Sequence, residues 1–394
     1  MTGPRVLVVH NRYRLHGGEE RAVELQLGAL RRAGIAHAAL FRDSGDAGRV
    51  RAARAMLAGG ERPDEVAVAV RDLGATVVHV HNMNPLFGPR SLAAAREAGA
   101  RVVLHLHNFR VFCSIAVCFR DGETCFRCRD RLTLPGAVLN CRGSVPESLV
   151  YASALARHQP AVFRAVDRFV TPSAFAAGQL GRLGLPSERL TVLANYLPRD
   201  DFASSTSAGE GGYAVAVGRL SVEKGFAYAV RAAALSRVPL RVAGDGPLDG
   251  ELRSLATSLG APVEFLGRVP PERVRDLLSG AAMAVVPSVG PDVMPFAALE
   301  AMAAGVPVVA ARSGSLPEVV GPERCVERRD PEALAAAMGE LWENPAKRSA
   351  EGAAALARAR ERFAEGRYLR DLLEIYGAGV TYFGRSQVSD RGDG

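Results

Sequence analysis

Short apolar runs rich in valine and leucine alternate with helical segments along almost the whole chain, and they form two successive series. Six runs lie in the first half, at residues 5–10, 37–41, 76–81, 101–107, 168–173 and 191–195. Five more lie in the second half, at residues 213–218, 240–246, 263–267, 283–288 and 306–311. Nearly continuous apolar strands separated by helices are typical of parallel sheets that are covered on both faces. The alternation predicts an α/β fold with two Rossmann-like, doubly wound domains that face each other across a cleft.

A polar stretch rich in glycine and serine separates the two series of strands. We therefore expect an N-terminal domain over residues 1–197, a linker over 198–212 and a C-terminal domain over 213–365. The segment 366–383 has a strongly helical pattern, and the polar tail 384–394 is expected to be disordered.

The composition, with 48% hydrophobic and 23% charged residues, is typical of a soluble globular protein. No apolar run in the sequence reaches the roughly 18–20 residues that cross a bilayer. The first residues do not read as a signal peptide, because their apolar run is short and lacks a cleavage site of small residues. We expect a cytoplasmic protein, either free or in peripheral contact with the inner face of the membrane.

The net charge of +7 and the isoelectric point near 9.3 raise the question of a nucleic-acid partner. The arginines are spread over many helical segments, as on solvated helix faces, and no known nucleic-acid-binding motif is present in the sequence. We therefore expect no nucleic acid as partner. Anionic substrates or an anionic membrane surface account for the charge equally well. The oligomeric state stays open.

Ligands in open α/β sheets bind outside the carboxyl ends of the strands, so the segments that follow the predicted strands are the candidate sites. One of them, GRLSVEKG at residues 218–225, follows the first strand of the second series and carries Arg219 and Lys224. Two cations in a loop flanked by glycines suit an anion such as a diphosphate. The alternative, that both are solvated loop residues, is left open by the spacing alone.

A second candidate is PDVMPFAALEAMAAGVPVVA, residues 291–310, which predicts a short helix followed by a buried strand. Pro295 fits the first helical position, and the amides from Phe296 onward form an anion site at the helix start. Glu300 lies one turn into the helix and suits the hydroxyls of a ribose, while Asp292 would reach another part of the same ligand. Alternatively, Glu300 is a buried ion-pair partner and Asp292 a surface acid.

Taken together, these stretches resemble the family 4 glycosyltransferases of the GT-B fold, over residues 5–380. The most specific parts are GRLSVEKG and the acidic pair Asp292 and Glu300, the second followed by Ala-Met-Ala-x-Gly-x-Pro-Val-Val. The family usually has glutamate followed by Gly-Phe-Gly at the first acidic position. Here Asp292 is one methylene shorter and is followed by Val-Met-Pro. The resemblance also implies that the C-terminal helix packs back on the first domain.

The resemblance implies a role for each residue of the second domain. Arg219 and Lys224 would neutralise the diphosphate of a nucleotide-diphosphate sugar, Glu300 would bind its ribose, and Asp292 would hold the sugar. The helix amides would assist Asp292, and three further residues complete this donor set: Phe296, Ala297 and, near the base, Arg268.

The resemblance assigns the first domain to the acceptor side. Gly17 and Gly18 would let the loop after the first strand approach the diphosphate closely, although an ordinary strand–helix turn would explain them as well. His107, at the end of the strand 101–107, occupies a position where the family commonly has a histidine facing the transferred sugar. A hydrogen-bonded packing role is the alternative for this histidine.

By this resemblance the chain is a retaining glycosyltransferase that transfers a sugar to a glycan, a lipid-linked or a small natural-product acceptor. We expect no metal cofactor for catalysis, because the predicted strand ends carry no Asp-x-Asp pair. Two other functions stay open: a sugar-nucleotide epimerase with the same two-domain plan, and a non-catalytic nucleotide-sugar-binding protein.

Five of the six cysteines fall between residues 113 and 141, within a long connection over 108–145 that we interpret as an insertion. A C-x-x-C pair with one cysteine on either side suits a tetrahedral zinc ion that orders the segment. The pattern is also similar to that of a cysteine-cluster subgroup of bacterial family members, from which Cys118 is absent. We expect a structural zinc ion at four residues: Cys113, Cys125, Cys128 and Cys141. Free buried thiols or a redox pair are the alternatives.

Overall fold

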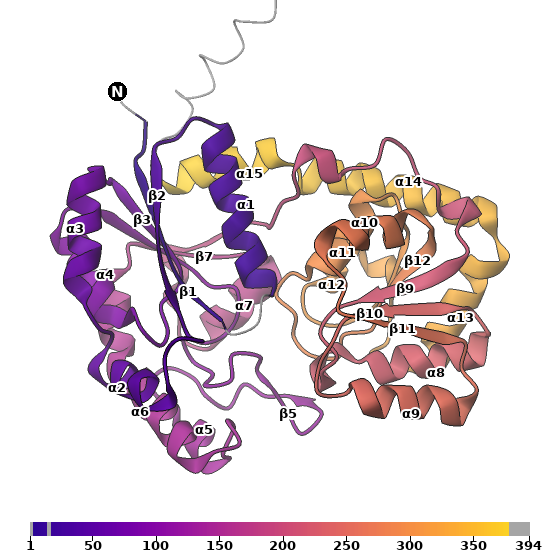
Figure 1. Ribbon diagram of the computed structural model, residues 1–394, viewed down its shortest axis with the longest axis horizontal. Coiled ribbons are helices and arrows are strands. Elements are labelled where there is room, and N and C mark those ends of the chain that lie inside the picture. Colours follow the sequence, from indigo (N-terminus) through magenta and orange to yellow (C-terminus); the bar gives the residue numbers. More distant parts are fainter. Residues whose placement is uncertain (1–2, 14–16, 378–394) are drawn as a thin grey trace, which may run out of the picture.

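The computed structural model describes residues 3–13 and 17–377, which form two α/β domains (Figure 1). The first contains a sheet in the order β2-β1-β3-β4-β7-β8, in which every pairing is parallel. Its elements are β1 (Val6–Arg12), α1 (Gly18–Arg32), β2 (His37–Asp43), α2 (Arg49–Ala58), α3 (Pro63–Leu73), β3 (Val77–Asn82), α4 (Gly88–Glu97), β4 (Arg101–His105), the antiparallel hairpin β5 (Phe119–Arg120) and β6 (Glu123–Thr124), α5 (Leu134–Val138), α6 (Val145–Ala165), β7 (Arg168–Thr171), α7 (Ala174–Arg182) and β8 (Leu190–Val192).

The second domain contains a parallel sheet in the order β11-β10-β9-β12-β13-β14. Its elements are β9 (Tyr213–Val217), the 3-10 turn η4 (Val222–Lys224), α8 (Phe226–Ser236), β10 (Leu240–Ala243), α9 (Asp249–Leu259), β11 (Val263–Gly267), α10 (Pro271–Ser279), β12 (Ala281–Val286), α11 (Phe296–Ala303), β13 (Val308–Ala311), α12 (Leu316–Val320), β14 (Cys325–Val326), α13 (Pro331–Glu343) and α14 (Pro345–Arg362). The last described helix, α15 (Glu365–Ile375), follows α14.

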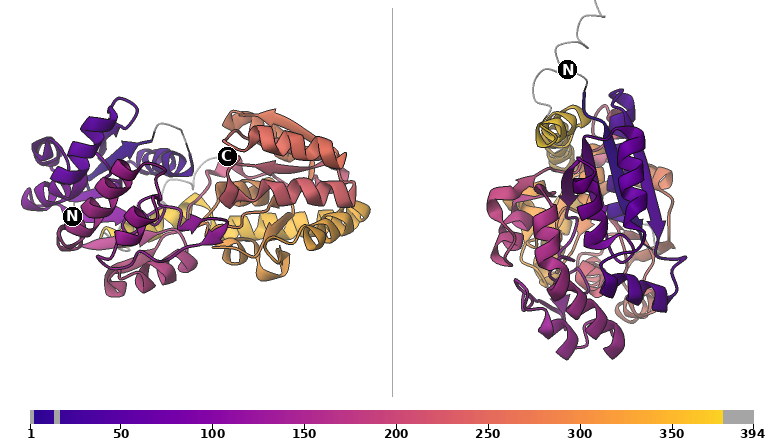
Figure 2. Two further views of the ribbon diagram at one scale, coloured as in Figure 1. Left: turned by 90° about the horizontal axis from the view of Figure 1, so that it is seen from below. Right: turned by 90° about the vertical axis from the view of Figure 1, so that its left-hand side faces the viewer.

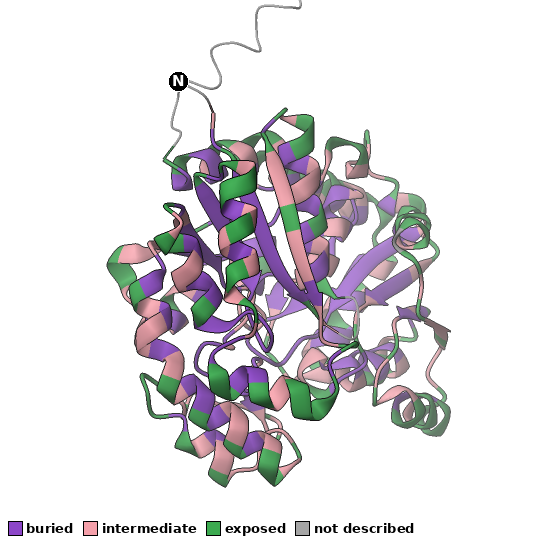
Figure 3. Ribbon diagram, turned by 60° about the vertical axis from the view of Figure 1, so that its left-hand side comes forward, coloured by how far each residue is buried: buried purple, intermediate pink, exposed green. Residues whose placement is uncertain are grey.

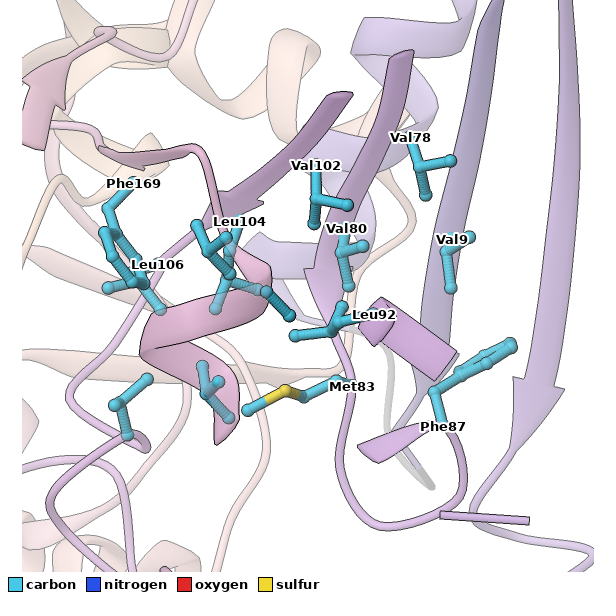
Figure 4. Close-up of a cluster of buried hydrophobic side chains, with 14 of the residues drawn as sticks. Val9, Val78, Val80, Met83, Phe87, Leu92, Val102, Leu104, Leu106 and Phe169 are labelled. Atoms are coloured by element: carbon cyan, nitrogen blue, oxygen red, sulfur yellow. The ribbon is translucent and has the colours of Figure 1, made fainter. Parts of the chain in front are cut away.

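Alternate residues of each central strand enter different apolar clusters, as expected for sheets covered on both faces. In β1, Leu7 and Val9 join one cluster while Val6 and Val8 join another. Figure 4 shows Val9 within the first cluster, together with residues of β3 and β4. The central strands are accordingly buried and the helices expose their outer faces, whereas the edge strand β2 is only partly buried (Figure 3). The predicted architecture of two doubly wound α/β domains is confirmed.

The C-terminal helix returns to the first domain, as the resemblance implied. Tyr368, Leu372 and Leu373 of α15 are buried in the cluster that holds Val6 and Val8 of β1. Figures 1 and 2 show the yellow C-terminal segment running from the second domain, along α14, to the first. The amphipathic sequence of α15 therefore has its apolar partner in the other domain.

The segment predicted as a linker, 198–212, lies against the second domain. Ala203 donates its amide proton to the carbonyl of Ala303 at 2.9 Å, and the Thr206 hydroxyl donates to the carbonyl of Gly305 at 2.6 Å. The domain boundaries themselves stay predictions, and the tail 384–394 lies outside the described residues.

The hairpin β5–β6 of the cysteine-rich segment reaches the second domain (Figure 1). Arg328 donates to the Thr124 hydroxyl at 3.2 Å, and Arg329 forms an ion pair with Glu123. The two domains are therefore linked by this hairpin as well as by α15. Within residues 3–13 and 17–377, none of the helices has the length and apolarity that a membrane span requires.

Candidate active site

The order of the second sheet, β11-β10-β9-β12-β13-β14, changes direction between β9 and β12. In doubly wound sheets a ligand-binding crevice lies at that switch point, outside the carboxyl ends of the strands. The segment after β9 carries Lys224, and the segment after β12 carries Asp292. Their side chains meet there, with 2.6 Å between Lys224 Nζ and Asp292 Oδ1.

Gly225 allows the loop of Lys224 to approach β12 this closely. Its φ of 69° is left-handed, and a Cβ at this position would collide with the carbonyl oxygen of Pro287 at the end of β12. The loop thereby brings Lys224 to Asp292. Within the described part of the chain, Asp292 Oδ2 is buried and has no hydrogen-bond partner. That oxygen remains available to accept a hydrogen bond from a ligand hydroxyl.

Arg219 lies in the same loop but is bound differently. Its side chain is 55% exposed, and Nη2 lies 2.5 Å from Glu223 Oε1, which also accepts from the Ser221 hydroxyl at 2.7 Å. Burial raises the pKa of Glu223, but the hydrogen bond from Ser221 and the charge of Arg219 outweigh it and hold the pKa below its ordinary value. Arg219 is therefore an exposed cation that is held by the carboxylate of Glu223, close to Lys224 in the chain.

Helix α11 begins at Phe296, so Pro295 is the N-cap and not the first helical residue that we expected. The amides of Phe296 and Ala297 occupy the first helical positions, which have no intrahelical acceptor and stand at the positive end of the dipole. Glu300 lies one turn later and forms no ion pair with the residues that the structure describes. Burial raises its pKa to about 7, while the charge of Arg21 lowers it.

The two domains meet at the starts of α1 and α11. Gly18 opens α1, and a Cβ there would lie 3.5 Å from Phe296 Cδ2, an ordinary contact. Arg21, one turn later in α1, forms an ion pair with Asp201 at 3.1 Å. Gly17 has an extended backbone, with φ of −147°, which any residue adopts. The structure thus places both glycines at the domain boundary without requiring glycine there for its backbone freedom.

His107 lies two residues beyond β4 and contacts a column of buried histidines. Its Nε2 is 2.8 Å from Nδ1 of His81, and its ring stacks on His105 with 4.0 Å between centroids. Burial lowers the pKa of His107 well below its ordinary value, and the charges of His105 and His10 add to this effect. His107 is therefore neutral at physiological pH and can accept or donate a hydrogen bond.

A small cavity lined mostly by polar residues adjoins His107, and most of these residues were not predicted from the sequence. Glu19 Oε2 accepts hydrogen bonds from the Tyr13 hydroxyl and from Asn108 Nδ2, both at 3.0 Å. Burial raises the pKa of Glu19 to about 8, against the charge of Arg110. The signals were present: two glutamates follow Gly17-Gly18, and Asn108 and Arg110 directly follow the predicted strand end.

Arg268 follows β11 at the edge of the second sheet and is exposed. Two strands separate β11 from β12, with β9 and β10 between them. Of the predicted donor residues in the described chain, Arg268 is the one that lies farthest along the sheet from Asp292. The structure does not join it to the Lys224–Asp292 pair.

The four cysteines predicted to bind zinc lie near one another, because burial together with the charges of Cys113, Cys141 and Cys125 raises the pKa of Cys128 to about 11. Among the residues that the structure describes, His79, His81 and His105 form the one group of three or more potential ligands whose atoms lie within 4.8 Å of one another. Cys113 instead has a hydrogen bond with Cys118, which lowers the pKa of Cys113 to about 6. Cys141 Sγ lies 3.6 Å from Arg120 Nη1. The four sulfur atoms are near one another but not within that distance, and the zinc site stays a prediction.

Two protein-family models match the chain. Residues 13–196 match the glycosyl transferase 4-like domain, and residues 211–344 match glycosyl transferases group 1. Together the two matches include the segments of His107, Lys224 and Asp292.

Curated relatives match over shorter stretches. One is the GDP-mannose-dependent monoacylated alpha-(1-6)-phosphatidylinositol monomannoside mannosyltransferase of Corynebacterium glutamicum, 37% identical over 126 residues, which are 30% of this chain and 33% of that protein. Another is the putative colanic acid biosynthesis glycosyltransferase WcaL of Escherichia coli, 31% identical over 195 residues, or 44% of this chain and 47% of the relative. The chain thus spans a third to a half of these relatives.

Solved structures match over almost the entire chain. Sucrose-phosphate synthase from Thermosynechococcus elongatus has a TM-score of 0.70 at 17% identity, covering 95% of this chain and 98% of that one. HepE from Anabaena, in complex with UDP, has a TM-score of 0.65 at 17% identity, covering 95% and 100%. At this identity the likeness establishes the fold.

Proposed function

The chain belongs to the group 1 glycosyltransferases, with a glycosyl transferase 4-like domain in its first half and the GT-B fold, and from that premise we propose that it transfers a sugar from a nucleotide-diphosphate donor to an acceptor hydroxyl. The observation that carries this proposal is the Lys224–Asp292 pair at the switch point of the second sheet, 2.6 Å apart beside the start of α11. A cation, a carboxylate and free helix amides at one crevice suit a phosphorylated sugar.

On the donor side, the diphosphate would bind Lys224 and Arg219, which would exchange Asp292 and Glu223 for phosphate oxygens. Asp292 would then accept hydrogen bonds from the sugar hydroxyls, and its unpartnered Oδ2 supports this role. Glu300 would accept hydrogen bonds from the ribose hydroxyls. One relative is a GDP-mannose-dependent enzyme and one structural neighbour is a complex with UDP, so both nucleotides are candidates for the donor.

On the acceptor side, the cavity beside His107 and Glu19 would hold the attacking hydroxyl. We propose a retaining reaction, as the family resemblance implies. The bond between the anomeric carbon and the phosphate oxygen breaks, the acceptor oxygen bonds to that carbon on the same face, and the acceptor proton passes to the departing phosphate. Lys224, Arg219 and the α11 amides would stabilise the negative charge that develops there, without a divalent ion.

The buried carboxyl of Glu19 favours one second candidate, a sugar-nucleotide epimerase, since that reaction needs an acid or base with a pKa near neutrality. Glu19, with a pKa of about 8 in the cavity of His107, has that property. A non-catalytic nucleotide-sugar-binding protein would use the same donor site but would have no acceptor site.

A thermal-shift panel of UDP-, GDP-, ADP- and dTDP-sugars tests the proposal. A ligand at 100 times its dissociation constant should add about 2.7 kcal/mol to the free energy of unfolding. The stabilising sugar nucleotide is then incubated with the enzyme and candidate acceptors, and the products are analysed by mass spectrometry. Glycosylated acceptor supports the transferase, a free epimerised sugar nucleotide supports the epimerase, and no stabilisation by any of the four rejects both.

The zinc ion at the cysteine-rich segment and a cytoplasmic location stay separate proposals. No step of the reaction is assigned to a metal at Cys113, Cys125, Cys128 and Cys141. Metal analysis decides the first proposal and fractionation of cells decides the second.

A further inference from the structure

Large hydrophobic side chains are exposed mainly at one end of the first domain. The described part of the chain exposes twelve of them, and seven lie either on α2 or between residues 132 and 149. Leu134 and Val138 are 60% and 74% exposed and lie one turn apart on α5. Val145 and Leu149, one turn apart at the start of α6, are 57% and 53% exposed. Two neighbouring helices therefore each turn an apolar stripe to solvent.

These elements adjoin one another in space. Helix α6 packs against both α2 and α5, and the three helices occupy the lower edge of the first domain in Figure 1. We define the α2–α5–α6 face as residues 49–58 and 127–157. An exposed apolar area of this kind on a soluble domain marks an interaction site.

The same face is strongly basic. Residues 49–58 and 127–157 contain eight arginines and two acids, Asp130 and Glu147, a net formal charge of +6 out of the chain's +7. Arg127, Arg129 and Arg131 are exposed and flank the apolar side chains. Arg49 and Arg142 contact Glu147, and Arg51 forms an ion pair with Glu61, which lies outside these ranges. The face keeps a positive net charge when Glu61 is included.

The face leads towards the candidate acceptor site. A small apolar cavity lies between α2 and α6, lined among others by Met56 and Leu155. It shares Met83, Asn84 and Val111 with the polar cavity of His107. A ligand resting on the α2–α5–α6 face would therefore be next to the residues that contact the acceptor.

We propose that the α2–α5–α6 face docks on an anionic lipid bilayer, with its leucines and valines in the interface and its arginines at the lipid phosphates. Interfacial helices bind in this way, by buried apolar area together with attraction to anionic lipids. Docking would present a lipid-linked acceptor to His107. That last step rests on the proposed function, whereas the docking does not.

Two other occupants fit the face less well. A second copy of the chain, joined by a twofold axis, would place the same basic surface against itself, and like charges would repel. A nucleic acid would use aromatic side chains for stacking, whereas the exposed apolar residues here are aliphatic. An anionic bilayer surface offers phosphates to the arginines and an apolar interface to the aliphatic side chains.

Co-sedimentation of the full chain with lipid vesicles tests the proposal. The protein should bind vesicles of phosphatidylcholine with phosphatidylglycerol, bind pure phosphatidylcholine at least tenfold more weakly, and dissociate as salt is raised. The Leu134→Ser/Val138→Ser and Arg127→Gln/Arg129→Gln variants should each bind at least tenfold more weakly. Matched exposed changes on the second domain, Leu235→Ser/Leu259→Ser and Arg231→Gln/Arg237→Gln, should leave binding unchanged.

The proposal is overturned if anionic vesicles do not bind the protein, if both vesicle types bind equally, or if the control variants lose as much binding. It is also overturned if sedimentation shows a dimer that the Leu134→Ser/Val138→Ser variant dissociates, or if an oligonucleotide is bound and vesicles are not. Sugar-nucleotide stabilisation is measured on the same variants and should not change. A failure of the proposed function appears in that measurement alone, so the two ideas are separable.

Discussion

Lys224 and Asp292 are 68 residues apart in the chain, yet their side chains form the ion pair that centres the donor site. Each could be identified from its local sequence, because Lys224 is a cation that follows β9 and Asp292 is a carboxylate that follows β12. Their meeting depends on Gly225, whose left-handed backbone lets the first loop lie against the end of β12. The residue-scale predictions follow from this pair and from Glu300.

Lys224→Ala should lower kcat by roughly a hundredfold or more, the scale of losing one preorganised charge-stabilising group. Lys224→Arg should restore little, because a planar guanidinium does not replace an ammonium in a tight loop. Lys347→Ala is the matched control, because Lys347 lies on α14 in contact with Glu340. The kcat of this variant should be normal. Activity should survive EDTA. Normal turnover of Lys224→Ala, or an immediate loss in EDTA that magnesium reverses, contradicts the assignment.

Glu300 should make sugar-nucleotide binding depend on pH near 7. Burial raises its pKa to about 7, so the free protein holds this proton at lower pH, whereas hydroxyls of a ribose donate to the carboxylate. Affinity for an intact sugar nucleotide should therefore rise as pH increases through 7, and Glu300→Gln should bind more weakly without that dependence. Isothermal titration between pH 6 and 8 measures both. An identical dissociation constant in the Gln variant removes Glu300 from the site.

The same raised pKa has a consequence for stability with a definite sign. Between the ordinary pKa of 4.5 and about 7, the folded protein binds more protons at Glu300 than the unfolded chain does. The contribution of this carboxyl to the free energy of unfolding therefore falls as pH rises through that window. Glu300→Gln should flatten this part of the stability profile.

At the scale of elements, the cysteine-rich segment combines a hairpin that reaches the second domain with a group of neighbouring cysteines. A zinc ion would draw these thiols together and order the segment. The hydrogen bond between Cys113 and Cys118 brings a cysteine next to the predicted set that the family pattern omits. Sequence spacing alone did not distinguish these arrangements.

Elemental analysis of the purified protein should find close to one zinc per chain, lost in Cys125→Ser/Cys128→Ser. Cys325→Ser is the control, since Cys325 is buried on β14 in the other domain. Zinc loss should lower thermal stability before it affects turnover. Protein free of zinc and fully stable would leave the cysteines as free thiols, the arrangement that the structure shows.

At the scale of the whole molecule, α15 makes the first domain depend on the end of the chain. Leu372 is fully buried against the first sheet, in the cluster of Val6 and Val8. Tyr376, just after α15, joins Gln26 of α1 at 3.0 Å and His79 of β3 at 2.8 Å. A segment that follows the second domain therefore completes the core of the first.

Leu372→Ala should reduce the free energy of unfolding by about 2–5 kcal/mol, the cost of a large-to-small change in a packed core. The exposed Leu235→Ala on α8 should change it by less than about 0.5 kcal/mol. Urea unfolding followed by circular dichroism measures both. Equal effects of the two substitutions would show that α15 does not stabilise the first domain.

The sequence by itself determined the architecture. Runs such as residues 5–10 and 213–218 are apolar on both faces, and that property is local, so it predicts buried parallel strands before any pairing is known. The same holds for Lys224 and Glu300, because a position just after a strand or one turn into a helix is defined by neighbours in the chain. The packing of α15 on the first domain was predicted from the family resemblance, because the apolar stripe of a helix does not show which surface it will contact.

Only the tertiary structure decided which side chains meet. Strand order brought Lys224 to Asp292, and the loop after β1 brought Glu19 to Asn108 beside His107. The packing of α2 and α5 on α6 gathered arginines from two distant segments onto one face. Contacts of this kind depend on burial and on distances between remote segments, and the periodicity of a sequence contains neither.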